Sequence, residues 1–214
     1  MKNNVINSIV ENKIIAIVRG VEREKLIPLA EAMYEGGIRL LEVTYSADGK
    51  VSDEETADRI KMLAEHFDGK MYIGAGTVLK VSQVELTKKA GGKFIISPDA
   101  YDEVIKKTAE LDMVSIPGVY TPSEITAAQR AGADFVKLFP ATSLGTDYIK
   151  AIKAPLSNSK ILVVGGVDAG NMKDFEKAGA SGFGIGSNII DKKALAEGDY
   201  AKITQLAKSY TDQL

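Results

Sequence analysis

The chain of 214 residues has no cysteine, no tryptophan and one histidine. Without cysteine there is no disulfide framework, no thiolate nucleophile and no cysteine-ligated zinc or iron–sulfur site. A single histidine also disfavours histidine-ligated metal hydrolysis or aldol chemistry, although a magnesium site built from carboxylates alone stays open. His66 ends a helical pattern, where histidine is usually a solvated residue, and we assign it no role.

Charge of one sign and long hydrophobic runs are lacking too. The 27 basic and 29 acidic residues leave a net charge of -2, which argues against nucleic-acid or polybasic membrane binding and favours small-molecule partners. No stretch approaches the roughly 20 apolar residues of a membrane span, and residues 1–10 lack the apolar region of a signal peptide. We therefore expect a cytoplasmic protein. A hydrophobic content of 45% and the absence of a linker predict one domain, residues 1–214.

Short runs rich in Val and Ile alternate with segments of helical period, which is typical of repeated βα units around a parallel sheet. The eight apolar runs are Ile14 to Arg19, Ile38 to Thr44, Met71 to Ala75, Lys93 to Ser97, Met113 to Ile116, Asp134 to Phe139, Ile161 to Val164 and Gly182 to Ile185. The helical segments include Glu22 to Tyr34, Thr56 to Phe67, Ser82 to Ala90, Ser123 to Ala131 and Asp168 to Ala178. Glycines at 36–37, 91–92, 132 and 179 follow four of them, as expected at helix C-termini.

Eight such units in about 200 residues predict an α/β fold of the (β/α)₈ TIM-barrel type. The alternative is an open doubly wound sheet whose ends have been miscounted. Gly74-Ala-Gly76 is too short for a dinucleotide fingerprint, so we reject a Rossmann interpretation.

Lys137 lies inside the apolar run Asp134-Phe-Val-Lys-Leu-Phe-Pro-Ala141. Burial lowers the pKa of a lysine, and a neutral amine is the nucleophile that forms a Schiff base with a carbonyl. The ordinary alternative is a structural ion pair. Glu42, in Leu40-Leu-Glu-Val-Thr44, is the natural partner, because a carboxylate in an apolar strand is also paired or carries a raised pKa. We favour a catalytic pair, with glutamate moving protons while lysine holds the substrate.

In a barrel, polar residues at the carboxyl ends of the strands gather at one mouth. Arg19 and Thr77 are two of them: Arg19 offers a fork to a carboxylate or phosphate, and Thr77 a hydrogen bond to a keto acid. Gly165-Gly-Val-Asp168 and Gly184-Ile-Gly-Ser-Asn188 follow the seventh and eighth runs. Their glycines let backbone N–H groups approach an anion closely, and the N-termini of the helices that follow favour negative charge. Alternatively, these are tight turns in which Asp168 and Ser187 or Asn188 cap helices.

The ordered motifs resemble the family of 2-keto-3-deoxy-6-phosphogluconate / 4-hydroxy-2-oxoglutarate aldolases, class I aldolases of the Entner–Doudoroff pathway. The motifs that carry the resemblance are Ala16-Ile-Val-Arg-Gly20, Leu41-Glu-Val-Thr44, Gly74-Ala-Gly-Thr-Val78, Ile96-Ser-Pro98, Ile116-Pro-Gly118, Val136-Lys-Leu-Phe-Pro-Ala141, Gly165-Gly-Val167, Gly184-Ile-Gly-Ser187 and Ala194-Leu-Ala-Glu-Gly-Asp-Tyr200.

The resemblance implies a Schiff base at Lys137 and general acid/base chemistry at Glu42. It also implies substrate contacts, which are Arg19 and Thr77 for the pyruvate half, Pro98 and Phe139 for the pocket wall, and Gly165, Gly166, Gly186 and Ser187 for the distal phosphate. It further implies a homotrimer without metal or cofactor. The expected reaction is cleavage of 2-dehydro-3-deoxy-6-phosphogluconate to pyruvate and glyceraldehyde 3-phosphate, with 4-hydroxy-2-oxoglutarate, giving pyruvate and glyoxylate, as a further substrate.

The chain departs from that pattern at one place. Many family members carry an arginine shortly after the Leu-Glu-Val-Thr stretch, whereas this chain continues Tyr45-Ser-Ala-Asp-Gly-Lys50. Arg19, Thr77 or Lys50 is then left to hold the substrate. Three alternatives stay open: an aldolase for another C4 configuration, an imine-free phosphate-binding barrel isomerase, and a non-catalytic ligand-binding barrel.

Overall fold

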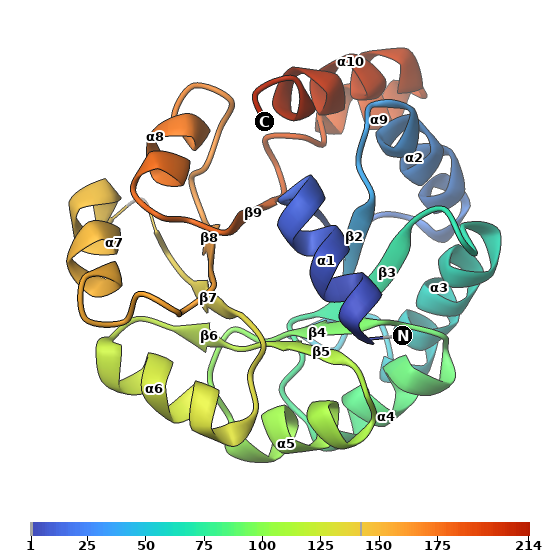
Figure 1. Cartoon of the computed structure of the whole chain (residues 1–214). Helices are drawn as coiled ribbons and strands as arrows, with labels where there is room; N and C mark the ends of the chain where they lie inside the picture. The colour runs from blue at the N-terminus through green and yellow to red at the C-terminus, as the bar shows by residue number, and fades with distance from the viewer. Residues whose placement is uncertain (1, 142) are drawn as a thin grey trace.

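The computed structural model describes residues 2–141 and 143–214. Met1 and Thr142, which the predicted domain includes, lie outside the described residues. Parallel strands form one sheet that closes into a barrel, and helices surround it (Figure 1). The strands are β1 Ile14–Val18, β2 Leu40–Thr44, β3 Tyr72–Gly76, β4 Phe94–Ile96, β5 Val114–Ile116, β6 Gly118–Val119, β7 Val136–Leu138, β8 Ile161–Val164 and β9 Gly182–Ile185. The α/β barrel expected from the sequence is confirmed.

The helices are α1 Lys2–Asn12, α2 Arg23–Glu35, α3 Asp53–His66, α4 Val81–Lys89, α5 Asp102–Glu110, α6 Pro122–Ala131, α7 Gly145–Lys153, α8 Met172–Lys177, α9 Lys192–Glu197 and α10 Tyr200–Thr211. The glycines expected after helices do take left-handed backbone angles, with φ of 93° at Gly37, 86° at Gly91, 112° at Gly132 and 109° at Gly179. No helix in the described part of the chain is long and apolar enough to cross a membrane.

One barrel strand is broken into two pieces, β5 and β6, at Pro117. Proline has no N–H group, so the ladder is interrupted there. β5 pairs with β4 and β6 pairs with β7, while the Lys137 N–H donates to the Pro117 carbonyl at 2.8 Å. With β5 and β6 counted as one strand, the described residues form the eight barrel strands that the periodicity predicts.

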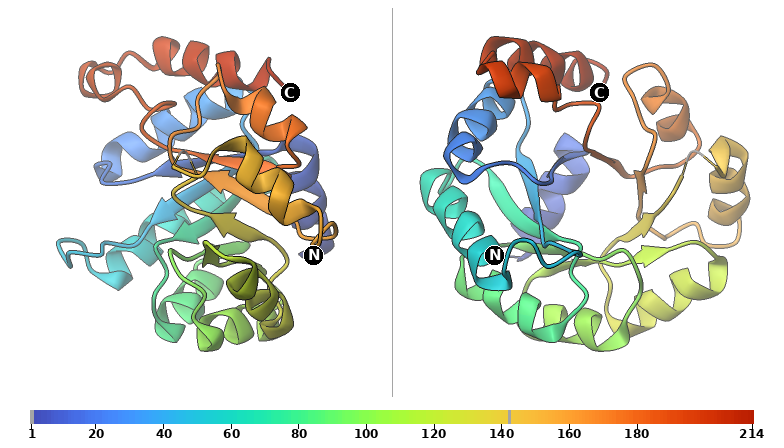
Figure 2. Two further views of the ribbon diagram at one scale, coloured as in Figure 1. Left: turned by 90° about the vertical axis from the view of Figure 1, so that its left-hand side faces the viewer. Right: turned by 180° about the vertical axis from the view of Figure 1, so that it is seen from behind.

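Helix α1, which the sequence analysis did not predict, covers the amino-terminal end of the barrel (Figure 1). Val5 and Ile9 are buried and pack against interior side chains that include Ile15, Leu40 and Phe94. The two views of Figure 2 place this helix on one side of the sheet, away from the loops that follow the strands. The amino-terminal end is therefore closed by apolar packing, which leaves the carboxyl end as the open mouth.

Side chains alternate between the two faces of a strand, so every second residue points into the barrel. Ile15, Leu40, Phe94, Phe135 and Leu162 form an interior apolar layer. Two residues further along β2 and β7, the same alternation brings Glu42 and Lys137 into the next layer of the interior. The period of the strand therefore places both charged groups directly beyond a buried apolar layer.

Two predicted helix starts are wrong. Residues 168–171 form a turn in which Asp168 Oδ1 accepts from the N–H groups of Gly170 and Asn171, and α8 begins only at Met172. Helix α9 is capped by Asp191, not by Ser187 or Asn188. The alternative in which Asp168, Ser187 or Asn188 caps a helix is therefore also wrong, because each lies in a turn before its helix.

Candidate active site

A cavity of about 560 Å³ opens at the carboxyl end of the barrel. Every site residue predicted from the sequence lines it: Arg19, Glu42, Thr77, Pro98, Lys137, Phe139, Gly165, Gly166, Gly186 and Ser187. The strand alternation explains the convergence, because these residues stand at or beyond the inward-facing ends of successive strands. A neighbouring cavity of about 680 Å³ shares Arg19, Gly186 and Ser187 with it.

Lys137 is 8% exposed and lies in β7, with its Nζ 4.8 Å from the centre of the Phe139 ring. Burial lowers the pKa of this lysine, Glu42 opposes that shift, and Arg19 adds to it. Because burial is the largest cause, a larger fraction of this amine is neutral near neutral pH than in an exposed lysine. The side chain is thus suited to nucleophilic attack.

Glu42 is 1% exposed, and its Oε2 has no hydrogen-bond partner among the described residues. Burial raises the pKa of this carboxyl, while Lys137 and Arg19 pull it back down. A Cβ atom at Gly76 would lie 1.5 Å from Glu42 Oε1, so only glycine leaves room for the carboxylate at that place. One oxygen of this buried carboxylate is therefore left without a hydrogen-bond partner among the described residues.

Arg19 and Thr77 meet at the rim of the site. Arg19 Nη2 donates to Thr77 Oγ1 at 3.1 Å. Thr77 has a φ of 56°, in the left-handed region that β-branched residues rarely adopt and that costs about 1–3 kcal/mol. Strain of this kind concentrates where side chains are held for a ligand.

The glycine turns after β8 and β9 also line the cavity, with β9 next to β1 in the sheet. Gly165 and Gly166 have φ of 92° and 75°, and a Cβ at Gly165 would come within 3.1 Å of the Phe139 ring. In the described part of the chain, the backbone N–H groups of Gly165, Gly166, Gly186 and Ser187 donate to no backbone carbonyl. Free N–H groups in a glycine turn suit an anion. The helix N-termini expected here begin too late to contribute.

The loop after β2 does not supply a further cation to the cavity lining. Lys50 is 83% exposed in its side chain and pairs with Asp48 at 2.8 Å, while Ser46 Oγ donates to Asp48 Oδ1 at 2.6 Å. Ala47 is the residue of this loop that lines the cavity. The cations that line it are Arg19 and Lys137, and Lys50 is not among the lining residues.

Sequence reasoning did not single out several further lining residues, among them Ile17, Ala47 and Leu79. Ile17 pairs in register with Glu42 across β1 and β2, so strand alternation is a signal that would have found it. Ala47 and Leu79 lie in loops, where no sequence period predicts the direction of a side chain. Their place in the site depends on the tertiary structure alone.

Comparisons with known proteins agree with this geometry. The family model for KDPG and KHG aldolases matches residues 5–206. The probable 2-dehydro-3-deoxy-6-phosphogalactonate aldolase of Rhizobium meliloti (strain 1021) is 38% identical over 190 residues, which cover 88% of this chain and 86% of that protein. The chain belongs to the KDPG and KHG aldolase family, whose activity is that of a carbon–carbon lyase.

Solved structures are similar over nearly the whole chain. A KDPG aldolase from Legionella pneumophila, with pyruvate captured as a covalent carbinolamine intermediate, has a TM-score of 0.83 and 29% identity and covers 93% of this chain and 94% of its own. A designed cube-shaped protein cage, built by fusing symmetric oligomeric domains, has a TM-score of 0.83 and 30% identity and covers 94% of this chain and 71% of its own.

Proposed function

We propose that the chain, acting as one domain, cleaves 2-dehydro-3-deoxy-6-phosphogluconate to pyruvate and glyceraldehyde 3-phosphate through a Schiff base at Lys137. The observation that carries this proposal is a buried lysine in the same interior layer as a buried glutamate, at a mouth with free backbone N–H groups. The carbinolamine in the Legionella relative supports the same chemistry.

The steps balance with residues of this chain. The neutral Lys137 amine attacks the C2 carbonyl, and protonated Glu42 gives a proton to the hydroxyl that leaves as water. The product is a protonated imine that serves as an electron sink, beside a Glu42 carboxylate. Glu42 takes the C4 hydroxyl proton, directly or through a water, while the C3–C4 bond breaks and the aldehyde leaves. Glu42 returns a proton to C3 of the enamine, and hydrolysis of the imine frees pyruvate and Lys137.

Substrate contacts follow from the same cavity. Arg19 and Thr77 hold the carboxylate of the pyruvate half, and Pro98 and Phe139 form the wall. The N–H groups of Gly165, Gly166, Gly186 and Ser187 surround the distal phosphate. Opposite shifts move the pKa values of Lys137 and Glu42 toward neutral pH, where a group can both accept and donate a proton during the reaction.

The C4 epimer, 2-dehydro-3-deoxy-6-phosphogalactonate, is a second candidate substrate, and the Rhizobium relative favours it. Both epimers give the same products, because C4 becomes the planar aldehyde carbon and its configuration is lost. The two substrates are separated by kcat/KM values measured from pyruvate release with each pure epimer. 4-Hydroxy-2-oxoglutarate, which lacks the phosphate, measures the contribution of the glycine turns in the same assay.

The imine is tested by borohydride reduction in the presence of pyruvate, followed by intact mass and peptide mapping. We expect a pyruvate adduct on Lys137, no adduct and no turnover in Lys137→Met, and an undiminished adduct in the control Lys160→Met, an exposed lysine before β8. A folded wild-type protein without an adduct would favour an imine-free isomerase or a non-catalytic barrel. Turnover by Lys137→Met near the wild-type rate would have the same meaning.

We also propose that the protein is a homotrimer. The similarity to a cage made from symmetric oligomeric domains supports self-association. Light scattering after gel filtration should give about three times the chain mass of 22.9 kDa. A mass equal to one chain at micromolar concentration would contradict this proposal.

A further inference from the structure

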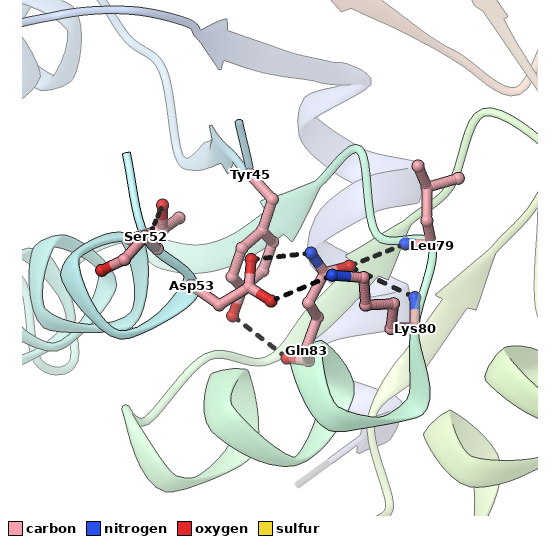
Figure 3. A network of polar contacts seen from close by, with 7 residues as sticks. Tyr45, Ser52, Asp53, Leu79, Lys80 and Gln83 are labelled. Carbon is pink, nitrogen blue, oxygen red and sulfur yellow. Dashed lines mark hydrogen bonds and ion pairs between the residues drawn. The ribbon is translucent and has the colours of Figure 1, made fainter. Parts of the chain in front are cut away.

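Gln83, on the first turn of α4, is a buried polar side chain outside the proposed chemistry. It is 4% exposed, and its amide contacts two different loops at the mouth of the barrel (Figure 3). Its Oε1 accepts from the N–H groups of Leu79 and Lys80, at 2.8 and 3.2 Å, and its Nε2 donates to Asp53 Oδ1 at 2.9 Å. The side chain therefore joins the loop before α4 to the start of α3.

The first of these loops carries Thr77. The left-handed backbone of this residue directs its hydroxyl to Arg19, and the residues that follow hold it there. Val78 N–H donates to the Ile96 carbonyl at 3.2 Å, and the next two N–H groups, of Leu79 and Lys80, donate to Gln83. Without the amide oxygen of Gln83, two consecutive N–H groups would lose their acceptor and the strained turn would be free to relax.

The second loop joins β2 to α3 and contains Ala47, which lines the cavity. Its far end is held at Asp53, which accepts from Gln83 and lies 3.8 Å from Lys80 Nζ. Its near end is held at Tyr45, whose hydroxyl donates to the main-chain carbonyl of Gln83 at 3.1 Å (Figure 3). Both ends of the loop therefore meet at one glutamine.

We infer that Gln83 is a positioning residue, whose side-chain oxygen holds the loop before α4 and so sets the Thr77 hydroxyl for binding of the pyruvate half of the substrate. This inference rests on the proposed function, because it assigns the Thr77–Arg19 side of the cavity to pyruvate. Helix capping alone explains only the contact with Lys80, since a glutamine at the third helical position commonly reaches back to that N–H. The contacts with Leu79 and Asp53 extend beyond the helix and cross to another element.

Gln83→Leu removes both hydrogen-bonding functions with a side chain of similar size. We expect the pyruvate concentration for half-maximal borohydride trapping to rise roughly tenfold, the size of one lost substrate hydrogen bond. The adduct on Lys137 at saturating pyruvate should remain. Gln83→Glu keeps an oxygen for Leu79 and Lys80 and should restore half-saturation to within about twofold of wild type, even if contact with Asp53 is lost.

Tyr45→Phe is the matched control, because it removes a buried hydroxyl from the same network without touching the Leu79 or Lys80 N–H groups. It should lower the melting temperature and leave half-saturation by pyruvate unchanged. Equal half-saturation in Gln83→Leu and wild type, with a stability loss like that of Tyr45→Phe, would reduce Gln83 to a structural residue. If Gln83→Leu does not fold, Gln83→Met takes its place in the same measurement.

Failure of the proposed function has a different signature. It would remove the adduct from the wild-type protein, and the inference would be rejected with it. A wild-type adduct with normal pyruvate affinity in the glutamine variants would reject the inference alone.

Discussion

At the scale of single residues, the site consists of charged groups whose environment opposes their charge. Lys137 and Glu42 are each almost fully buried, and burial is the largest cause of both pKa shifts. Desolvation of this kind destabilises a fold but prepares groups for proton transfer. Burial of the pair therefore lowers the stability of the fold while it prepares both groups for proton transfer, and the loss of stability depends on pH.

The pKa of Glu42 is raised above 4.5 in the folded protein. Between 4.5 and the raised value the folded chain binds more protons than the unfolded chain, so the free energy of unfolding falls as pH increases across this window. The amide in Glu42→Gln cannot release a proton, so the free energy of unfolding of this variant should not show the decrease that Glu42 causes. Urea unfolding at a series of pH values from 4.5 to neutral should show the variant gaining stability relative to wild type. Glu24→Gln, an exposed glutamate on α2, is the control, and a curve parallel to wild type for Glu42→Gln would contradict the prediction.

Arg19 is the cation expected to hold the substrate carboxylate. Arg19→Lys keeps the charge but loses the planar fork, and we expect KM to rise roughly tenfold or more. Lys50→Ala is the comparison, because Lys50 points to solvent and pairs with Asp48. Steady-state kinetics should show a KM within about twofold of wild type for Lys50→Ala, the range of an exposed pair. A larger effect at Lys50 than at Arg19 would place the carboxylate on the β2–α3 loop instead.

At the scale of elements, the strands decide which side chains point into the barrel, and the loops hold individual groups of the site in place. The alternation along β2 and β7 places Glu42 and Lys137 in the interior, whereas the β3–α4 loop needs Gln83 to keep Thr77 in place. Helix α1 contributes differently, because it closes the end of the barrel remote from the cavity. Its role should therefore be one of stability alone.

Ile9, on α1, is 0% exposed. Ile9→Ala should lower the free energy of unfolding by about 2–5 kcal/mol, since it opens a cavity in the interior packing. The neighbouring Val10 is 44% exposed, and Val10→Ala should change stability by no more than about 0.5 kcal/mol. Urea denaturation gives both values, and KM for the substrate should stay unchanged in either variant. A change in KM with Ile9→Ala would show coupling between the two ends of the barrel.

At the scale of the whole molecule, the barrel closes at an interrupted strand beside the proposed nucleophile. Gly118, after Pro117, pairs in register with Lys137, and a Cβ there would lie 2.2 Å from the Pro98 carbonyl oxygen. The closure thus joins β6, β7 and the loop after β4 at one point. Disturbance of this point should affect both stability and the position of Lys137.

Gly118→Ala should lower the free energy of unfolding by about 1–3 kcal/mol through overpacking against backbone. It should also reduce borohydride trapping at limiting pyruvate. Gly170→Ala is the control, because its added Cβ would meet the Asp168 side chain at 3.2 Å and not backbone. Thermal unfolding and trapping are measured on both. A loss of stability at Gly118 with normal trapping would show that the closure does not position Lys137.

Much of this molecule follows from local sequence. The Val- and Ile-rich runs predicted the barrel because short apolar strands that alternate with helices bury their side chains in a parallel sheet that the helices cover. Lys137 and Glu42 stood out because a charge inside an apolar strand is costly unless it has a partner or a function. The family resemblance and the fold it implied are confirmed, whereas the roles of the site residues remain predictions.

Long-range contacts were beyond local reasoning. Nothing near Gln83 in the sequence indicates that its side chain meets Asp53, thirty positions earlier. The start of α8 was placed too early, because the Asp168 side chain accepts hydrogen bonds within a turn that precedes the helix. Ser187 and Asn188 were offered as caps of the next helix, whereas Asp191 caps α9.

The sequence by itself determined the strand period, the chemistry of the charged residues and the glycines that open the mouth, since each depends on neighbours in the chain. The tertiary structure alone decided the break at Pro117, the closure by α1, the exclusion of Lys50 from the cavity and the meeting of two loops at Gln83. Those features depend on which segments approach one another when the barrel closes, and closure is a property of the whole sheet.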